Sequence, residues 1–144
     1  MKNDQNGFTL IESLLVLSIF MIISSITVFS LKPQRSVLED EAFLTQFKAD
    51  LYYSQQYAIS HQHEVSVVIL PSQYKYYMLL RPELPPIVIR NYSKNIILAT
   101  STLPLYFKFL NDGNVNQFGT LLIQTNNNTY QMTVLIGKGR FYVK

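Results

Sequence analysis

The stretch FTLIESLLVLSIFMIISSITVFSL, residues 8–31, decides the architecture of the chain. It contains about 24 residues, and Glu12 is its only charged side chain. At about 1.5 Å of rise per residue, a helix of this length measures about 36 Å, which exceeds the roughly 30 Å hydrocarbon core of a bilayer. The sequence therefore predicts a single membrane-spanning helix over residues 8–31.

The residues before this helix, MKNDQNG, are polar and end in Gly7. An ordinary secretory signal places its apolar core before a small-residue cleavage site, so the core is removed with the signal. Here the small residue, Gly7, precedes the apolar stretch. A cut at this glycine would therefore leave the apolar helix on the mature protein.

Glu12 needs an explanation, because a carboxylate near the bilayer centre costs on the order of 2.5 kcal/mol by insertion scales. It lies in the motif GFTLIE, positions 7–12. This motif resembles the class III signal of type IV pilins and pseudopilins. The resemblance implies that residues 1–7 are a leader peptide. It also implies that a membrane-embedded prepilin peptidase cuts between Gly7 and Phe8, and that the new amine of Phe8 is then methylated.

The resemblance also implies that Glu12 of one subunit pairs with the Phe8 amine of another during filament assembly. In a low-dielectric setting such a pair is favoured over two unpaired charges. The alternative is that Glu12 snorkels to the interface of a simple single-pass protein. Basic residues flank the apolar stretch on both sides, so charge does not fix its orientation. An external carboxyl-terminal part follows from the resemblance.

Residues 32–62 are expected to extend the stem as an amphipathic helix. Pro33 predicts a kink or break after Lys32. Apolar side chains then recur at intervals of three, four or seven positions, as on one helix face: Val37, Leu44, Phe47, Leu51 and Ala58. On the same segment, Tyr52, Tyr53 and Tyr57 are expected to pack against a sheet rather than to stack on nucleic-acid bases.

Residues 63–144 are expected to form a β-rich globular domain. Turn signals separate short apolar runs at 64–70, 74–80, 87–90, 96–100, 105–110, 119–124, 130–137 and 140–144. The predicted fold class is α+β and pilin-like, with a long amino-terminal helix packed on a mostly antiparallel sheet. The succession of NDGN, FGTLLI and IGKGR is similar to the carboxyl-terminal domains of H-type pseudopilins.

Composition narrows the function further. The chain carries 12 basic and 9 acidic residues, a formal charge of +3, which is too small to favour nucleic acid. The basic residues that a fold could bring into one patch are Lys75, Arg81, Arg90, Lys94, Lys108, Lys138 and Arg140. Direct DNA contact is therefore doubtful. The absence of cysteine excludes disulfides and thiolate metal sites. Together with the short leader, it makes the chain most similar to the D-type minor competence pseudopilins of Gram-positive DNA-uptake machinery.

No catalytic, metal or cofactor site is predicted, and the chain is not expected to be an enzyme. His61, His63 and Glu64 lie at a predicted helix end, where a solvated terminus is favoured over a metal site. The sequence GKGR at 137–140 is interpreted as a turn, because it lacks the spacing and the following helix of a phosphate loop.

Three hypotheses for the function remain. The first is a minor pilin-like subunit of a competence type IV pilus, required for assembly and DNA uptake in transformation. The second is a minor pseudopilin of a type II secretion system or of another type IV pilus. The third is an unrelated membrane-tethered binding module, whose leader is never removed.

For the first two hypotheses the resemblance implies particular partners and a location. The partners are a prepilin peptidase and the other pilin-like subunits of the filament, with an assembly ATPase and a polytopic membrane protein acting indirectly. The expected location is the cell membrane, and a surface filament after assembly.

Overall fold

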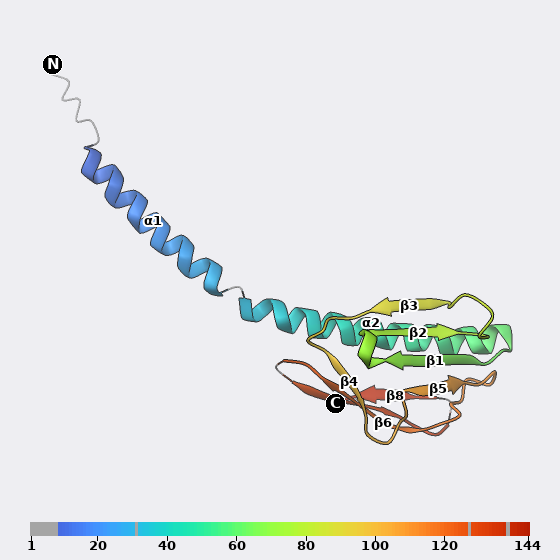
Figure 1. Ribbon diagram of the computed structural model, residues 1–144. Helices are drawn as coiled ribbons and strands as arrows, with labels where there is room; N and C mark the ends of the chain where they lie inside the picture. Colours follow the sequence, from blue (N-terminus) through green and yellow to red (C-terminus); the bar gives the residue numbers. More distant parts are fainter. Residues whose placement is uncertain (1–8, 31, 127, 138) are drawn as a thin grey trace, which may run out of the picture. The chain divides into compact units, whose positions relative to one another are not determined.

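The computed structural model describes residues 9–30, 32–126, 128–137 and 139–144. The chain divides into two compact units, Met1–Leu38 and Glu39–Lys144. Helix α1 (Leu10–Ser30) belongs to the first unit, helix α2 (Lys32–His61) begins in the first and continues in the second, and all of the strands belong to the second (Figure 1).

Helix α1 begins with a side-chain cap. The Glu12 backbone N–H donates to the Thr9 hydroxyl over 3.4 Å and to the Thr9 carbonyl over 3.1 Å. This is half of a capping box, in which a threonine precedes the helix and a glutamate stands three residues later. From Leu10 to Ile26 every side chain of α1 is exposed within the single chain.

Among the described residues, no helix combines the length and the apolar character needed to cross a membrane. The predicted span begins at Phe8 and ends at Leu31, and both residues lie outside the described part of the chain. The span stays a prediction.

The start of helix α2 differs from the boundary that was predicted from the sequence. The helix begins at Lys32 and continues through Pro33, so the break predicted after Lys32 does not occur. The physical reason is that Pro33 lies in the first helical turn, where a missing backbone N–H removes no helical hydrogen bond. At the other end, Gln62 adopts a left-handed φ of 54° and the His63 N–H donates to the Ala58 carbonyl over 3.2 Å. This is the hydrogen bond of a Schellman cap.

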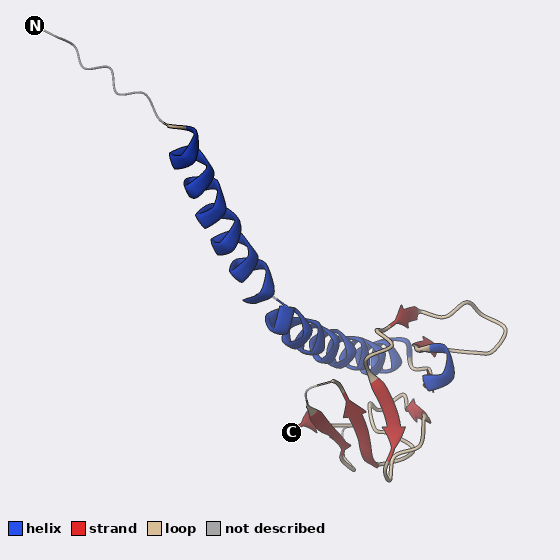
Figure 2. Ribbon diagram, turned by 60° about the vertical axis from the view of Figure 1, so that its left-hand side comes forward, coloured by secondary structure: helices blue, strands red, loops and turns tan. Residues whose placement is uncertain are grey.

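The strands form two four-stranded antiparallel sheets. Sheet A has the order β3-β2-β1-β5, and sheet B has the order β4-β6-β7-β8. The strands of sheet A are β1 (Val65–Leu70), β2 (Lys75–Leu79), β3 (Val88–Asn91) and β5 (Tyr106–Phe109). The strands of sheet B are β4 (Ile97–Thr100), β6 (Gly119–Gln124), β7 (Thr129–Val134) and β8 (Phe141–Val143). Figures 1 and 2 show the two groups of strands beside α2.

The predicted α+β class, strand positions and first and last hairpins are confirmed. The division into two sheets was not predicted. It arises because β5 returns to pair with β1, a contact between segments about 40 residues apart that no local pattern specifies.

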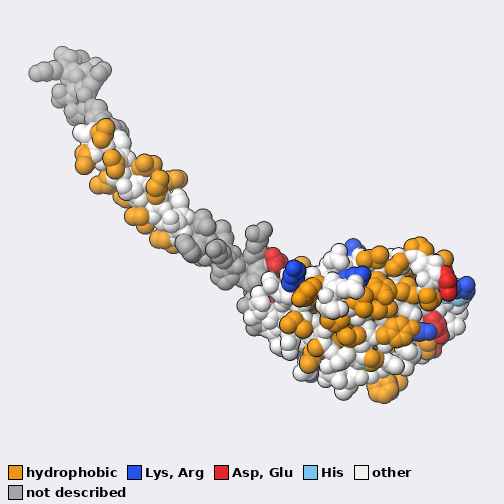
Figure 3. Space-filling view, in the orientation of Figure 1, with side chains coloured by type: hydrophobic (Ala, Val, Ile, Leu, Met, Phe, Trp, Pro, Cys, Tyr) orange, Lys and Arg blue, Asp and Glu red, His pale blue; other side chains and the backbone are white. Residues whose placement is uncertain are grey.

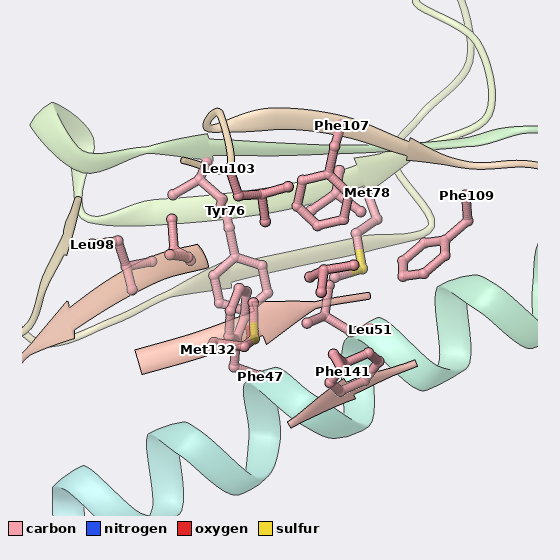
Figure 4. Packing of buried hydrophobic residues seen from close by; sticks show 14 of the residues in the cluster. Phe47, Leu51, Tyr76, Met78, Leu98, Leu103, Phe107, Phe109, Met132 and Phe141 are labelled. Atoms are coloured by element: carbon pink, nitrogen blue, oxygen red, sulfur yellow. The ribbon is translucent and has the colours of Figure 1, made fainter. Parts of the chain in front are cut away.

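One hydrophobic core joins α2 to both sheets (Figure 4). Helix α2 contributes Phe47 and Leu51, which are completely buried. Aromatic and aliphatic side chains from the strands close around them: Tyr76 and Met78 from β2, Phe107 and Phe109 from β5, Leu98 from β4, Met132 from β7 and Phe141 from β8. Of the predicted apolar helix positions, Val37 is exposed instead.

Candidate functional site

The residues predicted to be processed lie outside the described part of the chain. Gly7 and Phe8 are both in this position, so cleavage and methylation stay predictions. Glu12 is described, and its side chain is exposed in the first turn of α1. A carboxylate there is favoured by the positive end of the helix dipole. Glu12 therefore has a local role in helix initiation beside any role in pairing with another subunit.

The outer face of α2 has an unusual composition. Between residues 42 and 60 none of the exposed side chains is charged; they are Ala42, Thr45, Gln46, Ala49, Tyr52, Tyr53, Gln56, Ile59 and Ser60. An exposed helix face normally carries charged residues. A neutral face of this length is suited to packing against another helix, and it is called the neutral face below.

The tyrosines of α2 divide between two environments. Tyr52 packs on Phe141 of β8, with ring centroids 4.3 Å apart, and Tyr57 packs against the core. For these two, the predicted packing is confirmed. Tyr53 is half-exposed and its ring lies 6.0 Å from that of Tyr57 on the same helix, so packing of Tyr53 against a sheet stays a prediction.

A buried carboxylate connects α2 to sheet A. Asp50 is 5% exposed and accepts hydrogen bonds from the Tyr76 hydroxyl over 2.8 Å, the Gln46 amide over 2.8 Å and Arg90 Nε over 3.1 Å. Burial, and then the hydrogen bond to Asp50, raises the pKa of Tyr76. The hydrogen bond to Asp50 raises the pKa of Arg90 as well.

This cluster was not predicted from the sequence. The available signal was an acidic residue on the apolar side of an amphipathic helix, next to Leu51. Its partners come from β2 and β3, which only the folded chain brings near. The cluster fixes the helix on the sheet and is not arranged for chemistry, because the accepting oxygens of Asp50 are occupied by donors of the same unit.

Beside this cluster lies a small aromatic hollow of about 320 Å³, lined by Phe43, Tyr76, Tyr92 and Ile96 among others. The Tyr92 hydroxyl is buried, and no hydrogen-bond partner for it occurs among the described residues. Burial, and then the charge of Tyr74, raises the pKa of Tyr92 to about 12. A buried hydroxyl without a hydrogen-bond partner lowers the stability of the fold. We therefore interpret the Tyr92 hydroxyl as a destabilising feature of this unit and not as a reactive group.

His61 and Glu64, which were singled out in the sequence, make contacts within the globular unit. His61 stacks on Tyr57 with ring centroids 3.8 Å apart. Glu64 accepts a hydrogen bond from Lys108 Nζ over 3.1 Å. Within the described residues, no group of three or more His, Cys, Asp or Glu side chains could hold a metal ion. The Leu135 N–H donates to the Arg140 carbonyl over 2.8 Å. The segment from 137 to 140 is therefore the link between β7 and β8, as interpreted from the sequence.

The basic residues do not gather on one face of sheet A. Arg90 is paired with Asp50 on the side facing α2. Lys75 and Lys108 lie on the opposite side of the sheet, because their strand neighbours Tyr76 and Phe107 point into the core. Figure 3 shows hydrophobic side chains across the middle of one face of the globular unit and charged ones mainly toward its ends.

The apolar helix with a single acid in its first turn, and the second helix packed on antiparallel sheets, make the chain similar to type IV pilins. Residues 2–28 match the family described as "Prokaryotic N-terminal methylation motif".

The chain is similar to competence protein ComGD of Bacillus subtilis (strain 168). The two are 28% identical over 142 residues, which cover 99% of this chain and 95% of that protein. The fold is similar to that of the type IV minor pilin FimU of Pseudomonas aeruginosa (strain PAO1) in two crystal forms. The TM-scores are 0.60 and 0.61 at 14% and 13% identity, with 72% and 79% of this chain and 91% of FimU covered. At this identity the likeness to FimU shows the fold alone.

Proposed function

We propose that the protein is a minor subunit of a competence pilus and is required for pilus assembly and DNA uptake. The observation that carries the proposal is α1, which is apolar, exposed on all sides from Leu10 to Ile26, and acidic only at Glu12. Such a helix needs an apolar environment, first lipid and then other subunits. The similarity to ComGD along 99% of the chain supports competence over other pilus systems.

The proposal includes a sequence of events. A prepilin peptidase removes residues 1–7, the Phe8 amine is methylated, and residues 8–31 hold the subunit in the membrane with the globular unit outside. Residues 32–62 then continue the stem toward the β-rich domain of residues 63–144. The neutral face of α2 packs against the helices of neighbouring subunits. An assembly ATPase and a polytopic membrane protein act on the subunit indirectly. The protein works by assembling and has no catalytic role.

A minor pseudopilin of a secretion system or of another type IV pilus is the second candidate, favoured by the likeness of the fold to a type IV minor pilin. The phenotype of a deletion strain distinguishes the competence pilus from these alternatives. Loss of transformation with normal protein secretion and normal twitching supports competence. The opposite pattern supports the alternative.

Substitutions of Glu12 test the proposed role of this residue in assembly. Glu12→Gln and Glu12→Ala should be processed and inserted normally, because a charge has been removed from an apolar helix. Their recruitment into filaments should fall, since the partner amine loses its carboxylate at a cost of about 3 kcal/mol. The matched control is Glu41→Gln, which removes an exposed carboxylate from α2.

The measurement compares the subunit in membrane fractions with that in sheared surface fractions, alongside transformation frequency. Normal filaments and normal transformation with Glu12→Ala would show that the carboxylate has no part in assembly.

A further inference from the structure

The two outer strands of sheet A differ in how their free edges are used. The edge of β5 is covered, because the Lys108 N–H donates to the Asn116 side-chain oxygen over 2.7 Å and the Asn116 N–H donates to the Lys108 carbonyl over 3.0 Å. At the other end of the sheet β3 is the last strand, and it lies at the margin of the unit in Figure 1. An uncovered strand edge offers backbone donors and acceptors to another chain.

The register shows which backbone groups of β3 point away from β2. The Tyr92 N–H donates to the Tyr74 carbonyl over 2.8 Å, and this pair continues the register of β2 and β3. In an antiparallel ladder, hydrogen-bonded pairs alternate with pairs that are not hydrogen-bonded. Arg90 therefore bonds to β2 through its backbone, whereas the N–H and C=O groups of Ile89 and Asn91 face outward. Within the described part of the chain, no hydrogen bond engages these outward groups.

The aromatic hollow adjoins this open edge on the side that faces α2. Arg90 and Asn91 of β3 lie in its lining, and so do Ala42 and Gln46 of α2. Both α2 residues also belong to the neutral face. The volume of about 320 Å³ is at the lower end of the range of roughly 300–1,000 Å³ that is usual for ligand pockets. The open edge and the neutral face therefore meet at a hollow with room for a side chain.

A strand added beside β3 would direct its side chains alternately to the two faces of the sheet. Its residues opposite Ile89 and Asn91 would exchange backbone hydrogen bonds with them and point away from α2. The residue between these two would stand opposite Arg90 and point to the same side as the Arg90 side chain. That side faces α2, because Arg90 Nε donates to Asp50 over 3.1 Å. One side chain of the added strand would therefore enter the hollow.

The lining of the hollow favours an apolar or aromatic side chain. The rings of Phe43 and Tyr92, with centroids 5.5 Å apart, form an aromatic wall. Arg90 is bound to Asp50, and its side chain is still 49% exposed, so an aromatic ring can stack on the guanidinium group. Glu39 is exposed in the same lining and disfavours an incoming acid by charge repulsion.

A second copy of the chain does not match this edge. Antiparallel pairing of two β3 strands through all of the outward groups would place Arg90 opposite Arg90 of the second copy, and like charges directly opposite each other are destabilising. We infer that β3 and the aromatic hollow form a docking site for an extended segment of another protein. This segment adds a fifth strand to the four-stranded sheet A and inserts an apolar or aromatic side chain into the hollow.

The test uses the full-length protein in detergent micelles and a capped peptide, acetyl-TVTFTVT-amide, as the probe. Threonine and valine favour strands, and the central phenylalanine is placed to enter the hollow. Hydrogen exchange measured by NMR should show rapid exchange of the Ile89 and Asn91 amides in the free protein. Their exchange should slow about tenfold when about nine-tenths of the protein is bound. The control peptide acetyl-TVPFPVT-amide keeps the phenylalanine but lacks the N–H groups that pair with β3, and should have no effect.

Two pairs of variants separate the edge from the hollow. Ile89→Pro removes one outward N–H without breaking a bond to β2 and should weaken peptide binding roughly tenfold, whereas Ile89→Thr keeps this N–H. Ala42→Phe fills the hollow and should abolish the slowing at Asn91. Ala49→Phe is its matched control, because it adds the same ring to an exposed position of α2 outside the lining of the hollow.

Circular dichroism of each variant shows whether the fold is retained, and the Ala42 pair still tests the site if Ile89→Pro does not fold. Slowing that is lost in Ile89→Pro and Ala42→Phe but kept in Ile89→Thr and Ala49→Phe supports the site. Three results overturn it: no slowing at millimolar peptide, equal slowing by the proline-containing peptide, or an equal loss in Ala49→Phe.

Discussion

The Asp50 cluster predicts how firmly α2 is held on sheet A. Asp50→Ala removes a 5% exposed carboxylate and leaves the Tyr76 hydroxyl, on a residue only 1% exposed, without its acceptor. Removing one partner of a buried charged cluster costs about 3–5 kcal/mol. Because the Arg90 side chain is 49% exposed and can turn to water, we expect the lower end, about 3 kcal/mol.

Tyr76→Phe should cost less, because Asp50 keeps the donors from Gln46 and Arg90. A hydrogen bond to a charged group contributes about 1.5–3 kcal/mol, so a loss of about 2 kcal/mol is expected. In the double variant the hydroxyl and its acceptor are both absent. The two single losses should therefore exceed the combined loss by about 1–2 kcal/mol.

The assay is urea unfolding of the full-length chain in detergent micelles, followed by near-ultraviolet circular dichroism. With 10 tyrosines and no tryptophan, this signal reports tyrosine packing. Glu64→Ala is the control, because it breaks an ion pair whose side chains are 33% and 53% exposed and should leave the midpoint unchanged. Strictly additive losses in the double variant, or an equal loss in Glu64→Ala, would refute the view of Asp50 as the anchor of α2.

The mature protein should begin at Phe8 with 144 − 7 = 137 residues, and Gly7→Ile should leave full-length precursor in the membrane; mass spectrometry showing normal cleavage of that variant would contradict the leader assignment. Gly139→Ala should destabilise the globular unit by about 2 kcal/mol or more, because a Cβ there would lie 2.7 Å from Gln55 Nε2 and closer still to the Gly113 carbonyl. Gly137→Ala meets no neighbouring atom and should cost only backbone strain of about 1 kcal/mol, so equal unfolding midpoints for the two variants would count against this contact. Stability should decline as pH rises from about 10 to about 12, because the pKa of Tyr92 is raised to about 12 and the unfolded chain loses this proton first, whereas below pH 10 the contribution is complete; Tyr92→Phe should reduce this slope in pH-dependent unfolding, and an unchanged slope would speak against it.

Features that depend on neighbouring residues could be predicted from the sequence. Local patterns of a few residues predicted the helices, most strands and two hairpins. These patterns are the apolar run with Glu12, the amphipathic period of residues 34–62, and turn residues such as Asp112 and Gly113. The family resemblance followed from the same local motif at positions 7–12.

Features that depend on pairing between distant segments became visible only in the folded chain. The return of β5 to β1 divides the strands into two sheets. It also places Tyr106 opposite Tyr77 across Val68. Asp50 likewise finds Tyr76 and Arg90 at separations of 26 and 40 residues. A sequence pattern indicates which side chains can be buried. Which distant segments then pair with one another depends on the packing of the whole core.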